Sequence, residues 1–138
     1  MAGYERVTPA TRTRMQAVRR QDTEPEIFVR RMLHGMGYRF RLHRKDLPGT
    51  PDIVLPKLKK AVLVHGCFWH GHENCRRAIL PKSNAVTWAA KIENNKARDL
   101  KQTVALRKLG WDVMVVWECE VKNAAEETRS RLCTFLST

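Results

Sequence analysis

Apolar residues recur along the chain in two patterns, and each pattern predicts a different element of secondary structure. Apolar positions three and four residues apart are typical of an amphipathic helix, whereas a short continuous apolar run is typical of a buried strand. The predicted order is helix, strand, strand, strand, helix, strand, helix. The helices cover about residues 23–36, 88–109 and 123–136, and the strands cover about residues 38–42, 52–55, 61–64 and 111–117.

The first predicted helix has signals at both ends. Asp22 or Thr23 can cap its N-terminus, and Pro25 is tolerated in the first turn because the N–H groups there have no helical partner. Gly37 suits the turn that ends this helix. Its apolar face is predicted to consist of Ile27, Phe28, Met32, Leu33 and Met36.

The two later helices are bounded in a similar way. The long helix is expected to stop at Gly110, and Asn123 is expected to cap the last one. Cys133 falls on the apolar side of the last helix and is predicted to belong to the core. The buried face of the long helix is predicted to consist of Trp88, Ile92, Leu100, Val104 and Leu109.

The four strands predict a central mixed β-sheet flanked by helices, which is an α/β fold. Strands 52–55 and 61–64 are joined by a polar turn and form a hairpin. Strand 111–117 follows a crossover helix, so it is expected to run parallel to its neighbour. We therefore predict one domain over residues 23–138, preceded by a basic arm over residues 1–22.

Composition narrows the class of protein and of partner. The 138 residues are 43% hydrophobic and 29% charged, which is typical of a globular domain. The chain shows neither an apolar run that could cross a bilayer nor an apolar signal sequence, so we expect a cytoplasmic protein. Lys and Arg total 26 against 14 acidic residues. This excess favours a polyanionic partner such as nucleic acid, with a solubilising surface as the alternative.

The segment 65–84 carries most of the candidate chemistry. Cys67, His72 and Cys75 fall within it, and Cys119 follows the last strand. Three ligands from one loop and a fourth from a distant strand end match a tetrahedral zinc site, and thiolates favour zinc over magnesium. The alternative is that these are ordinary buried cysteines, since disulfides are rare in cytoplasmic proteins.

Two acidic residues are candidates for a second metal. Asp52 opens a buried strand, where a carboxylate is costly unless it binds something. Magnesium takes few protein ligands and fills its shell with water and phosphate oxygens, so Asp52 is a candidate ligand. Glu26 is either a supporting carboxylate of this site or an acid favoured by the helix dipole.

The middle of the loop offers a proton carrier beside two aromatic rings. His70 lies two residues from the proposed ligand His72, so it would be held rigidly without binding the metal, as a general acid or base requires. His65 either shares this work or forms a hydrogen bond at the strand end. Phe68 and Trp69 are either a wedge that stacks on bases or core aromatics that cover the sheet.

Taken together, these residues resemble the very short patch repair endonucleases. The resemblance covers about residues 8–135, and its most specific part is the run Gly66-Cys67-Phe68-Trp69-His70. It also rests on residues 48–52, 65–72, 110–111 and 115–119 and on the N-terminal runs 12–15 and 22–26.

The resemblance implies a restriction-endonuclease-like core, a structural zinc and catalytic Mg²⁺. Members of this family nick DNA 5′ to the mismatched thymine of a T:G pair, where 5-methylcytosine has deaminated. By motif, Asp52 would be the metal-binding catalytic carboxylate, His70 the catalytic histidine, and Glu26 and His65 supporting residues. Phe68 and Trp69 would intercalate beside the mismatch. The arm would contact DNA through Arg12, Arg14, Met15, Arg19 and Arg20, and the zinc ligands would be Cys67, His72, Cys75 and Cys119.

The chain departs in two ways from the pattern that the resemblance implies. Where related cores often carry an acidic-x-Lys motif, this chain has Val64-His65-Gly66, so Val64 offers only its backbone carbonyl to Mg²⁺. The spacing from His72 to Cys75 is also one residue longer than in some members.

We therefore predict a Mg²⁺-dependent endonuclease that acts, as a monomer, on double-stranded DNA with a T:G mismatch. One alternative is a restriction- or defence-type nickase on the same fold, without a mismatch requirement. Another is a zinc-stabilised DNA-binding module without activity. The pair of Asp52 and His70 argues against that module, because a protein that only binds DNA gains nothing from a carboxylate near phosphates.

Overall fold

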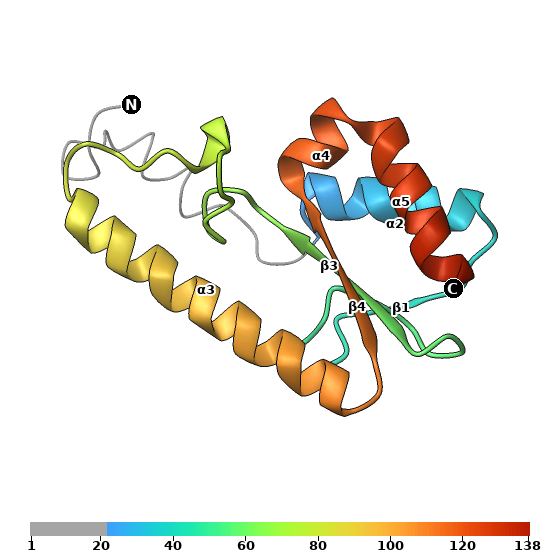
Figure 1. The fold of residues 1–138 in the computed structure, drawn as a ribbon. Helices are drawn as coiled ribbons and strands as arrows, with labels where there is room; N and C mark the ends of the chain where they lie inside the picture. The colour runs from blue at the N-terminus through green and yellow to red at the C-terminus, as the bar shows by residue number, and fades with distance from the viewer. Residues whose placement is uncertain (1–21) are drawn as a thin grey trace.

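A four-stranded sheet separates one long helix from three shorter ones in the computed structural model, which describes residues 22–138 (Figure 1). The predicted arm, except Asp22, lies outside the described residues. The elements in chain order are α2 (Glu24–Gly35), β1 (Arg41–Leu42), β2 (Ile53–Leu55), β3 (Lys60–His65), the 3₁₀-helix η2 (Arg76–Ala78), α3 (Ala85–Lys108), β4 (Asp112–Trp117), α4 (Glu118–Asn123) and α5 (Ala125–Ser137).

The sheet is mixed, as the sequence predicts, and its strand order is β1-β2-β3-β4. The pairs β1–β2 and β2–β3 are antiparallel, so the predicted hairpin is present. The crossover helix α3 leads into β4, which pairs with β3 in parallel from Lys60 opposite Asp112 to His65 opposite Trp117. Since parallel strands end at the same edge of a sheet, the segments after His65 and Trp117 begin side by side.

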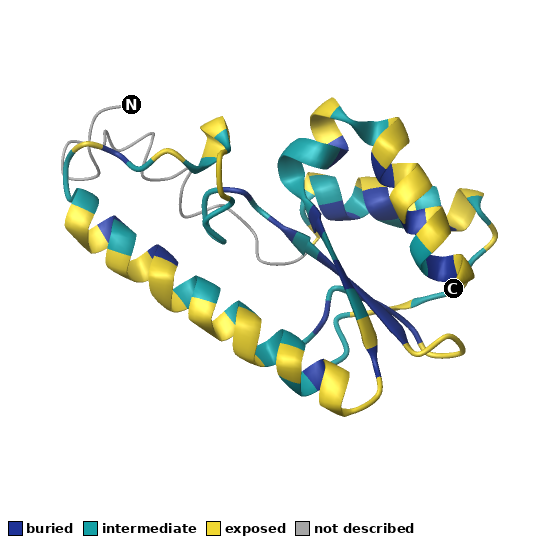
Figure 2. Cartoon of the chain, in the orientation of Figure 1, coloured by how far each residue is buried: buried dark blue, intermediate teal, exposed yellow. Residues whose placement is uncertain are grey.

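Each face of the sheet has its own core. Ile53 and Leu55 pack with α2, α4 and α5 through Leu33, Val121 and Leu132. Val54 and Ala61 point to the opposite face, where Leu106 of α3 and Trp111 cover them. This division follows from the alternation of side chains along a strand. Figure 2 shows the result as an almost continuous buried band along β2 and β3 between exposed helix faces.

Helix α2 begins and ends close to where the sequence predicts. Thr23 is the N-cap, and Gly37 has a φ of +86° just after the last turn. The predicted apolar face is wrong in part, because Phe28 is 42% exposed while Val29 and Leu33 are fully buried. The buried stripe also contains Glu26, so a carboxylate occupies a position that an apolar pattern cannot detect.

The predicted buried face of α3 is also partly wrong. Trp88 and Ile92 are buried, but Leu100, Val104 and Leu109 are 65%, 40% and 53% exposed. The side of α3 that faces the rest of the protein carries polar residues in its middle, so the apolar pattern indicates the wrong side there. These inward residues are Trp88, Ile92, Asn95, Asp99, Gln102 and Leu106.

The C-terminal region differs from the prediction at two residues. Asn123 ends the unpredicted short helix α4, and Ala124 precedes α5. Cys133 is exposed rather than part of the core, because the buried stripe of α5 consists of Thr128, Leu132 and Leu136. Among residues 22–138, no helix has the length and apolar character needed to cross a membrane.

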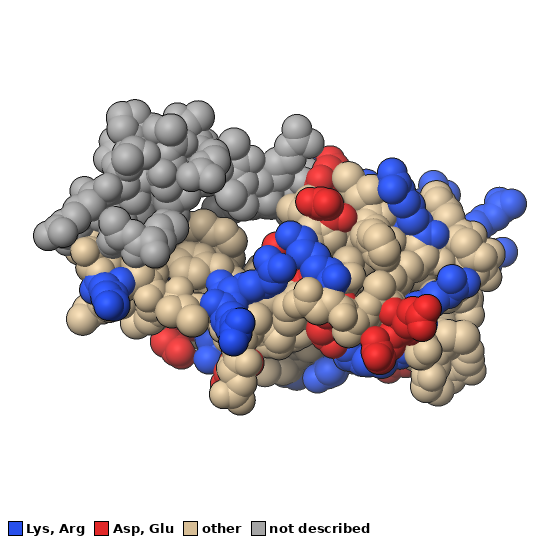
Figure 3. Space-filling model, turned by 90° about the horizontal axis from the view of Figure 1, so that it is seen from above, with Lys and Arg blue, Asp and Glu red and all other residues tan. Residues whose placement is uncertain are grey.

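The basic excess of the chain is visible on its surface. In the view from above, Lys and Arg side chains form one group in the middle of the molecule and further groups toward both ends, with acidic side chains between them (Figure 3). Such a surface attracts a polyanion over a distance of several ångströms.

Candidate active site

The ends of β3 and β4 bring four metal-ligating side chains together. Cys67 lies just after β3, Cys119 lies in the first turn of α4, and His72 and Cys75 come from the loop between β3 and α3. Their ligating atoms all lie within 4.8 Å of one another. The Cys119 sulfur is 3.4 Å from Nδ1 of His72, and the Cys119 N–H donates to the Cys67 sulfur over 3.4 Å. The grouping of these four residues agrees with the sequence prediction.

The donor set fits a tetrahedral zinc ion. Metal–ligand bonds of 2.0–2.3 Å place neighbouring donors roughly 3.3–3.8 Å apart, close to the spacing seen here. Burial raises the pKa of the Cys67 thiol to about 12. A thiolate at this position therefore needs a cation beside it. Because η2 is the only regular element between β3 and α3, such an ion would hold this loop to the sheet.

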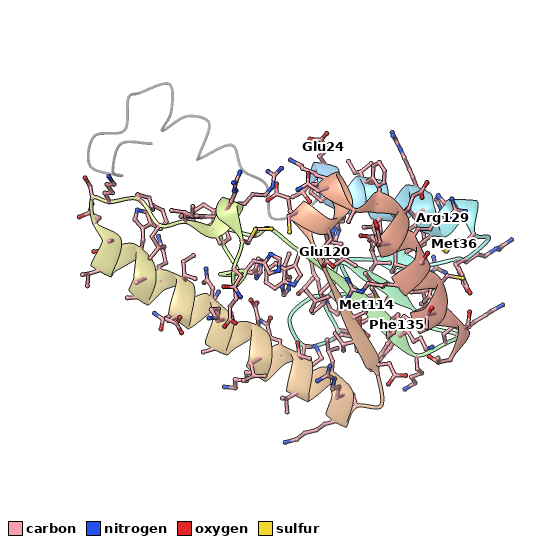
Figure 4. All side chains as sticks on the ribbon, turned by 45° about the horizontal axis from the view of Figure 1, so that its top comes forward. Glu24, Met36, Met114, Glu120, Arg129 and Phe135 are labelled. Atoms are coloured by element: carbon pink, nitrogen blue, oxygen red, sulfur yellow. The ribbon has the colours of Figure 1, made fainter. Side chains whose placement is uncertain are left out.

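The turn that carries Cys119 is itself held in place. Glu120, labelled near the start of α4 in Figure 4, accepts a hydrogen bond from the Trp117 N–H over 2.9 Å. The other oxygen of Glu120 contacts Arg131 of α5. These contacts fix the step from β4 into α4, so Cys119 stays directed toward the loop.

Asp52 meets the end of β3 from the other strand of the hairpin. Its Oδ2 atom accepts the N–H of Val64 over 2.8 Å. Burial raises the pKa of Asp52 to about 7, while the hydrogen bond from Val64 lowers this pKa and the charge of Glu26 raises it further. Glu26 is 1% exposed. Because its charge acts on Asp52, the two carboxyl groups lie close together, as the sequence predicts.

This carboxylate site fits a divalent cation. A buried carboxyl group with a raised pKa gains stabilisation when a cation pairs with its ionised form. Asp52 would hold the ion with help from the carbonyl of Val64, whose N–H already fixes the Asp52 side chain. The carbonyl contact remains a prediction.

A histidine–carboxylate pair lies beyond the same strand end. The Nδ1 atom of His70 is 2.6 Å from Oδ2 of Asp99, which comes from the inward side of α3. Asp99 belongs to none of the sequence motifs that point to the site. The signal that could reveal it is the helical spacing from Trp88, Ile92 and Asn95, which places it on the inward side of α3.

His65 packs directly against this pair. Its ring lies parallel to that of His70, with centroids 3.9 Å apart and an interplanar angle of 5°. Burial lowers the pKa of His65 to about 4, and the charge of His70 lowers it further, while Asp99 raises it. His65 is therefore neutral near pH 7, which favours a packing or hydrogen-bonding role over proton transfer.

The geometry of this group suits proton transfer rather than metal binding. The lone pairs of stacked, parallel imidazoles lie in separate parallel planes, so His65 and His70 do not direct them to one ion. With Nδ1 donating to Asp99, the Nε2 atom of His70 is left to accept a proton or to deliver one.

The ring of Trp117 contacts both His72 of the candidate zinc cluster and His65 of the stacked His65–His70 pair. Its ring stacks on His72 with centroids 4.1 Å apart, and it meets the edge of His65 at 5.2 Å. The candidate zinc cluster and the His65–His70 pair therefore share one rigid neighbour at the end of β4.

The two loop aromatics lie outside both cores of the described residues. Phe68 and Trp69 are half-buried and pack on Trp88 of α3, with centroid distances of 5.2 and 5.6 Å. The side-chain amide of Asn95 donates to the Trp69 carbonyl over 2.9 Å. This location argues against the alternative that Phe68 and Trp69 are core aromatics that cover the sheet. Both rings lie next to His70 in the loop.

The remaining predicted DNA contacts lie outside the described residues. These are Arg12, Arg14, Met15, Arg19 and Arg20. Their role in binding stays a prediction.

Comparisons with known proteins point to one family. Residues 5–77 match the family model described as DNA mismatch endonuclease Vsr. The type II nicking enzyme V.XorIIP of Xanthomonas oryzae pv. oryzae is 54% identical over 129 residues, which are 92% of this chain and 94% of that protein. The type II nicking enzyme V.NmeAIP of Neisseria meningitidis is 47% identical over 111 residues, covering 80% and 79%. The DNA mismatch endonuclease Vsr of Escherichia coli K12 is 36% identical over 124 residues, covering 89% and 79%. The chain therefore belongs to the Vsr family and is a DNA endonuclease.

Proposed function

We propose that this endonuclease nicks one strand of double-stranded DNA 5′ to the thymine of a T:G mismatch, with Mg²⁺ at the catalytic centre and a structural Zn²⁺. The observation that supports this proposal most is that three consecutive residues, Phe68, Trp69 and His70, combine two aromatic rings with a candidate catalytic histidine. The two rings lie outside the core, and the histidine is paired with Asp99. Stacking rings enter a duplex at lowest cost where pairing is already weak, as at a mismatch.

In this proposal His70 moves the proton of the hydrolytic step. Its Nε2 atom takes a proton from the attacking water, while Asp99 holds the ring and stabilises the imidazolium that forms. When bound, Mg²⁺ neutralises charge on the scissile phosphate. Asp52 and the Val64 carbonyl would hold this ion, Glu26 would support Asp52, and neutral His65 would support the ring of His70.

The proposed zinc has a structural role. Cys67, His72, Cys75 and Cys119 would join the loop to the start of α4. Phe68, Trp69 and His70 lie between two of these ligands, so the ion would limit their movement relative to the sheet. In the arm, Arg12, Arg14, Met15, Arg19 and Arg20 would contact the DNA.

A second candidate is a nickase without a mismatch requirement. It is supported by the names of the relatives from Xanthomonas oryzae and Neisseria meningitidis, which are both called type II nicking enzymes. This candidate uses the same catalytic groups and differs only in what Phe68 and Trp69 do.

A nicking assay distinguishes the two candidates. Paired duplexes that differ only in T:G against C:G, each in several sequence contexts, are incubated with Mg²⁺ and zinc-loaded protein. Rapid nicking of one strand of the T:G duplexes alone is expected, and it should be lost in the double variant Phe68→Ala/Trp69→Ala. Equal cleavage of both duplexes would overturn the mismatch requirement and favour the second candidate. Since one active site suffices to cut one strand, we also propose a monomer, which light scattering of the enzyme on DNA can test.

A further inference from the structure

Glu26 is a buried carboxylate that two side chains from different parts of the fold contact at the same oxygen. Arg30, one turn further along α2, contacts its Oε2 atom. The Nε2 atom of His43, which follows β1, lies 2.9 Å from the same Oε2. Since a carboxylate can only accept here, both side chains act as donors.

His43 adopts an unusual backbone conformation to reach this position. Its φ is +47°, in the left-handed region that residues other than glycine rarely adopt. Its N–H donates to the carbonyl of Asp52 over 3.1 Å, so the same residue contacts the candidate metal carboxylate through its backbone and Glu26 through its ring. Such strain persists only where surrounding contacts compensate for it, and it is frequent at functional sites.

The two acidic residues share His43 as a neighbour. Glu26 lies close enough to act on Asp52, and His43 contacts Glu26 through its ring and Asp52 through its backbone N–H. Arg30 also contacts Asp22, so its guanidinium is shared between two carboxylates. The ring of His43, which is 15% exposed, binds Glu26 from the side of β1 and β2.

We propose that His43 is a positioning residue of the catalytic centre: with Arg30 it holds Glu26 at one oxygen, and Glu26 in turn keeps the Asp52 side chain in place for the divalent metal. This inference rests on the proposed function, because it takes Asp52 as the metal carboxylate. It predicts that the ring of His43 affects metal binding, not only stability.

The experiment compares two substitutions of His43 in the full-length, zinc-loaded protein. His43→Gln keeps an N–H donor near the place of Nε2. His43→Asn tolerates the left-handed backbone but is too short to reach Glu26. His34→Asn is the control, since His34 is an exposed residue of α2 that stacks on Phe40. Binding of Mn²⁺ is measured by the loss of the free-ion EPR signal, and nicking is measured across a range of Mn²⁺ concentrations.

The expected result separates metal binding from the other properties. In His43→Asn the dissociation constant for Mn²⁺ should rise about tenfold or more, as is typical when a residue that orients a metal ligand is lost. The Mn²⁺ concentration for half-maximal nicking should rise by the same factor, while the KM for DNA stays unchanged. His43→Gln should restore most of the binding. Arg30→Met should weaken Mn²⁺ binding in the same direction, and it serves as the second variant if His43→Asn does not fold.

Two outcomes in the His43 variants would overturn the inference. One is parental Mn²⁺ binding in a folded His43→Asn protein, and the other is an equal loss of Mn²⁺ binding in the Gln and Asn variants. Asp52→Asn, measured in parallel, identifies the cause. If Asp52→Asn loses Mn²⁺ binding and His43→Asn does not, only the role of His43 fails. If Asp52→Asn binds Mn²⁺ like the parent, the metal assignment of the proposed function fails, and this inference fails with it.

Discussion

The Nδ1 atom of His70 lies 2.6 Å from the Oδ2 atom of Asp99, and this contact joins the loop after β3 to the middle of α3. Both groups are partly shielded, with side-chain exposures of 29% and 21%. A carboxylate in this position selects one tautomer of the imidazole and stabilises its protonated form. The pair therefore supports the proposed role of His70 as a proton carrier.

Replacing Asp99 should impair chemistry and leave the fold largely intact. In Asp99→Asn the amide no longer stabilises the imidazolium, so the single-turnover nicking rate at saturating Mg²⁺ should fall about 10²- to 10⁴-fold. DNA affinity and the melting temperature should change little. Asp112→Asn is the matched control, because Asp112 is an exposed residue of β4. A parental rate in Asp99→Asn would exclude the pair from the reaction.

The zinc cluster predicts a sharp difference between two cysteines. Cys119→Ser removes one of the four proposed ligands, so the protein should lose most of its zinc and several kcal/mol of unfolding free energy, on the order of what structural zinc sites contribute. Cys133→Ser changes an exposed thiol outside the cluster and should behave like the parent. Elemental analysis and urea unfolding measure both effects. Absence of zinc from freshly purified parent protein would refute the cluster as a zinc site.

His65 should make the protein less stable in mild acid. The pKa of His65 is about 4 in the folded protein and near 6.5 in the unfolded chain, so between these values only the unfolded chain takes up a proton. The unfolding free energy should thus fall as the pH drops from 6.5 toward 4, by up to about 3 kcal/mol. His65→Asn removes this dependence. The difference in unfolding free energy between His65→Asn and the parent, measured in urea at pH 8 and at pH 5, isolates the contribution of His65 from that of other groups. If this difference is the same at both pH values, His65 is not buried as a neutral ring.

Asp52 should have the opposite pH dependence. Its pKa is raised from an ordinary value near 3.8 to about 7, so the folded protein holds a proton here that the unfolded chain releases. The unfolding free energy of the Mg²⁺-free protein should thus decrease as the pH rises through this range. Asp52→Asn should therefore be more stable than the parent at pH 8, with a smaller gain at pH 5, and it should be inactive. Lower stability of Asp52→Asn at pH 8 would contradict the burial of an uncompensated charge.

The turn before Asp52 should tolerate no side chain at Gly49. The φ of Gly49 is +74°, and a Cβ atom there would lie 2.7 Å from Cδ of Gln102 on α3. Gly49→Ala should cost about 1–3 kcal/mol of unfolding free energy and reduce nicking, because the backbone is strained at positive φ and the Gln102 side chain must move. Adding Gln102→Ala should recover the steric part only.

Gly35→Ala is the control for this prediction. Nothing lies within 4 Å of a Cβ atom at Gly35, which ends α2, so this change should be neutral or slightly stabilising. If Gly49→Ala behaves in the same way, the close packing of α3 on the turn is not required.

The sequence predicts the sheet and the grouping of the four candidate ligands well, because both follow from the order and type of the strands. A strand after a crossover helix runs parallel to its neighbour, so Cys119 at the end of β4 had to approach Cys67 at the end of β3. Asp52 is a candidate site residue because a carboxylate at the start of a buried strand is costly unless it binds something.

Other parts of the site depend on information that such patterns lack. Asp99 continues the helical spacing of the buried Trp88 and Ile92, but it is polar, and the apolar pattern follows the exposed Leu100 and Val104 instead. His43 contacts Glu26 from a left-handed backbone conformation, which the neighbouring sequence does not predict. Helix α4 is short, and its start is fixed by the side chain of Glu120.

Helix α3 makes three contacts with two functional segments from one side: Asn95 binds the Trp69 carbonyl, Asp99 binds the neighbouring His70, and Gln102 packs on the turn before Asp52. A helix rises about 1.5 Å per residue, so these contacts lie within roughly 10 Å along a single rigid axis. The proposed point of base insertion and the point of cleavage are thereby held at a constant separation. Inserting one residue between Asn95 and Gln102 would rotate one of these two side chains by about 100° around the helix axis relative to the other. Which phosphate is cut, counted from the inserted rings, would then follow from the length of this helix, without any base being read at the cleavage site.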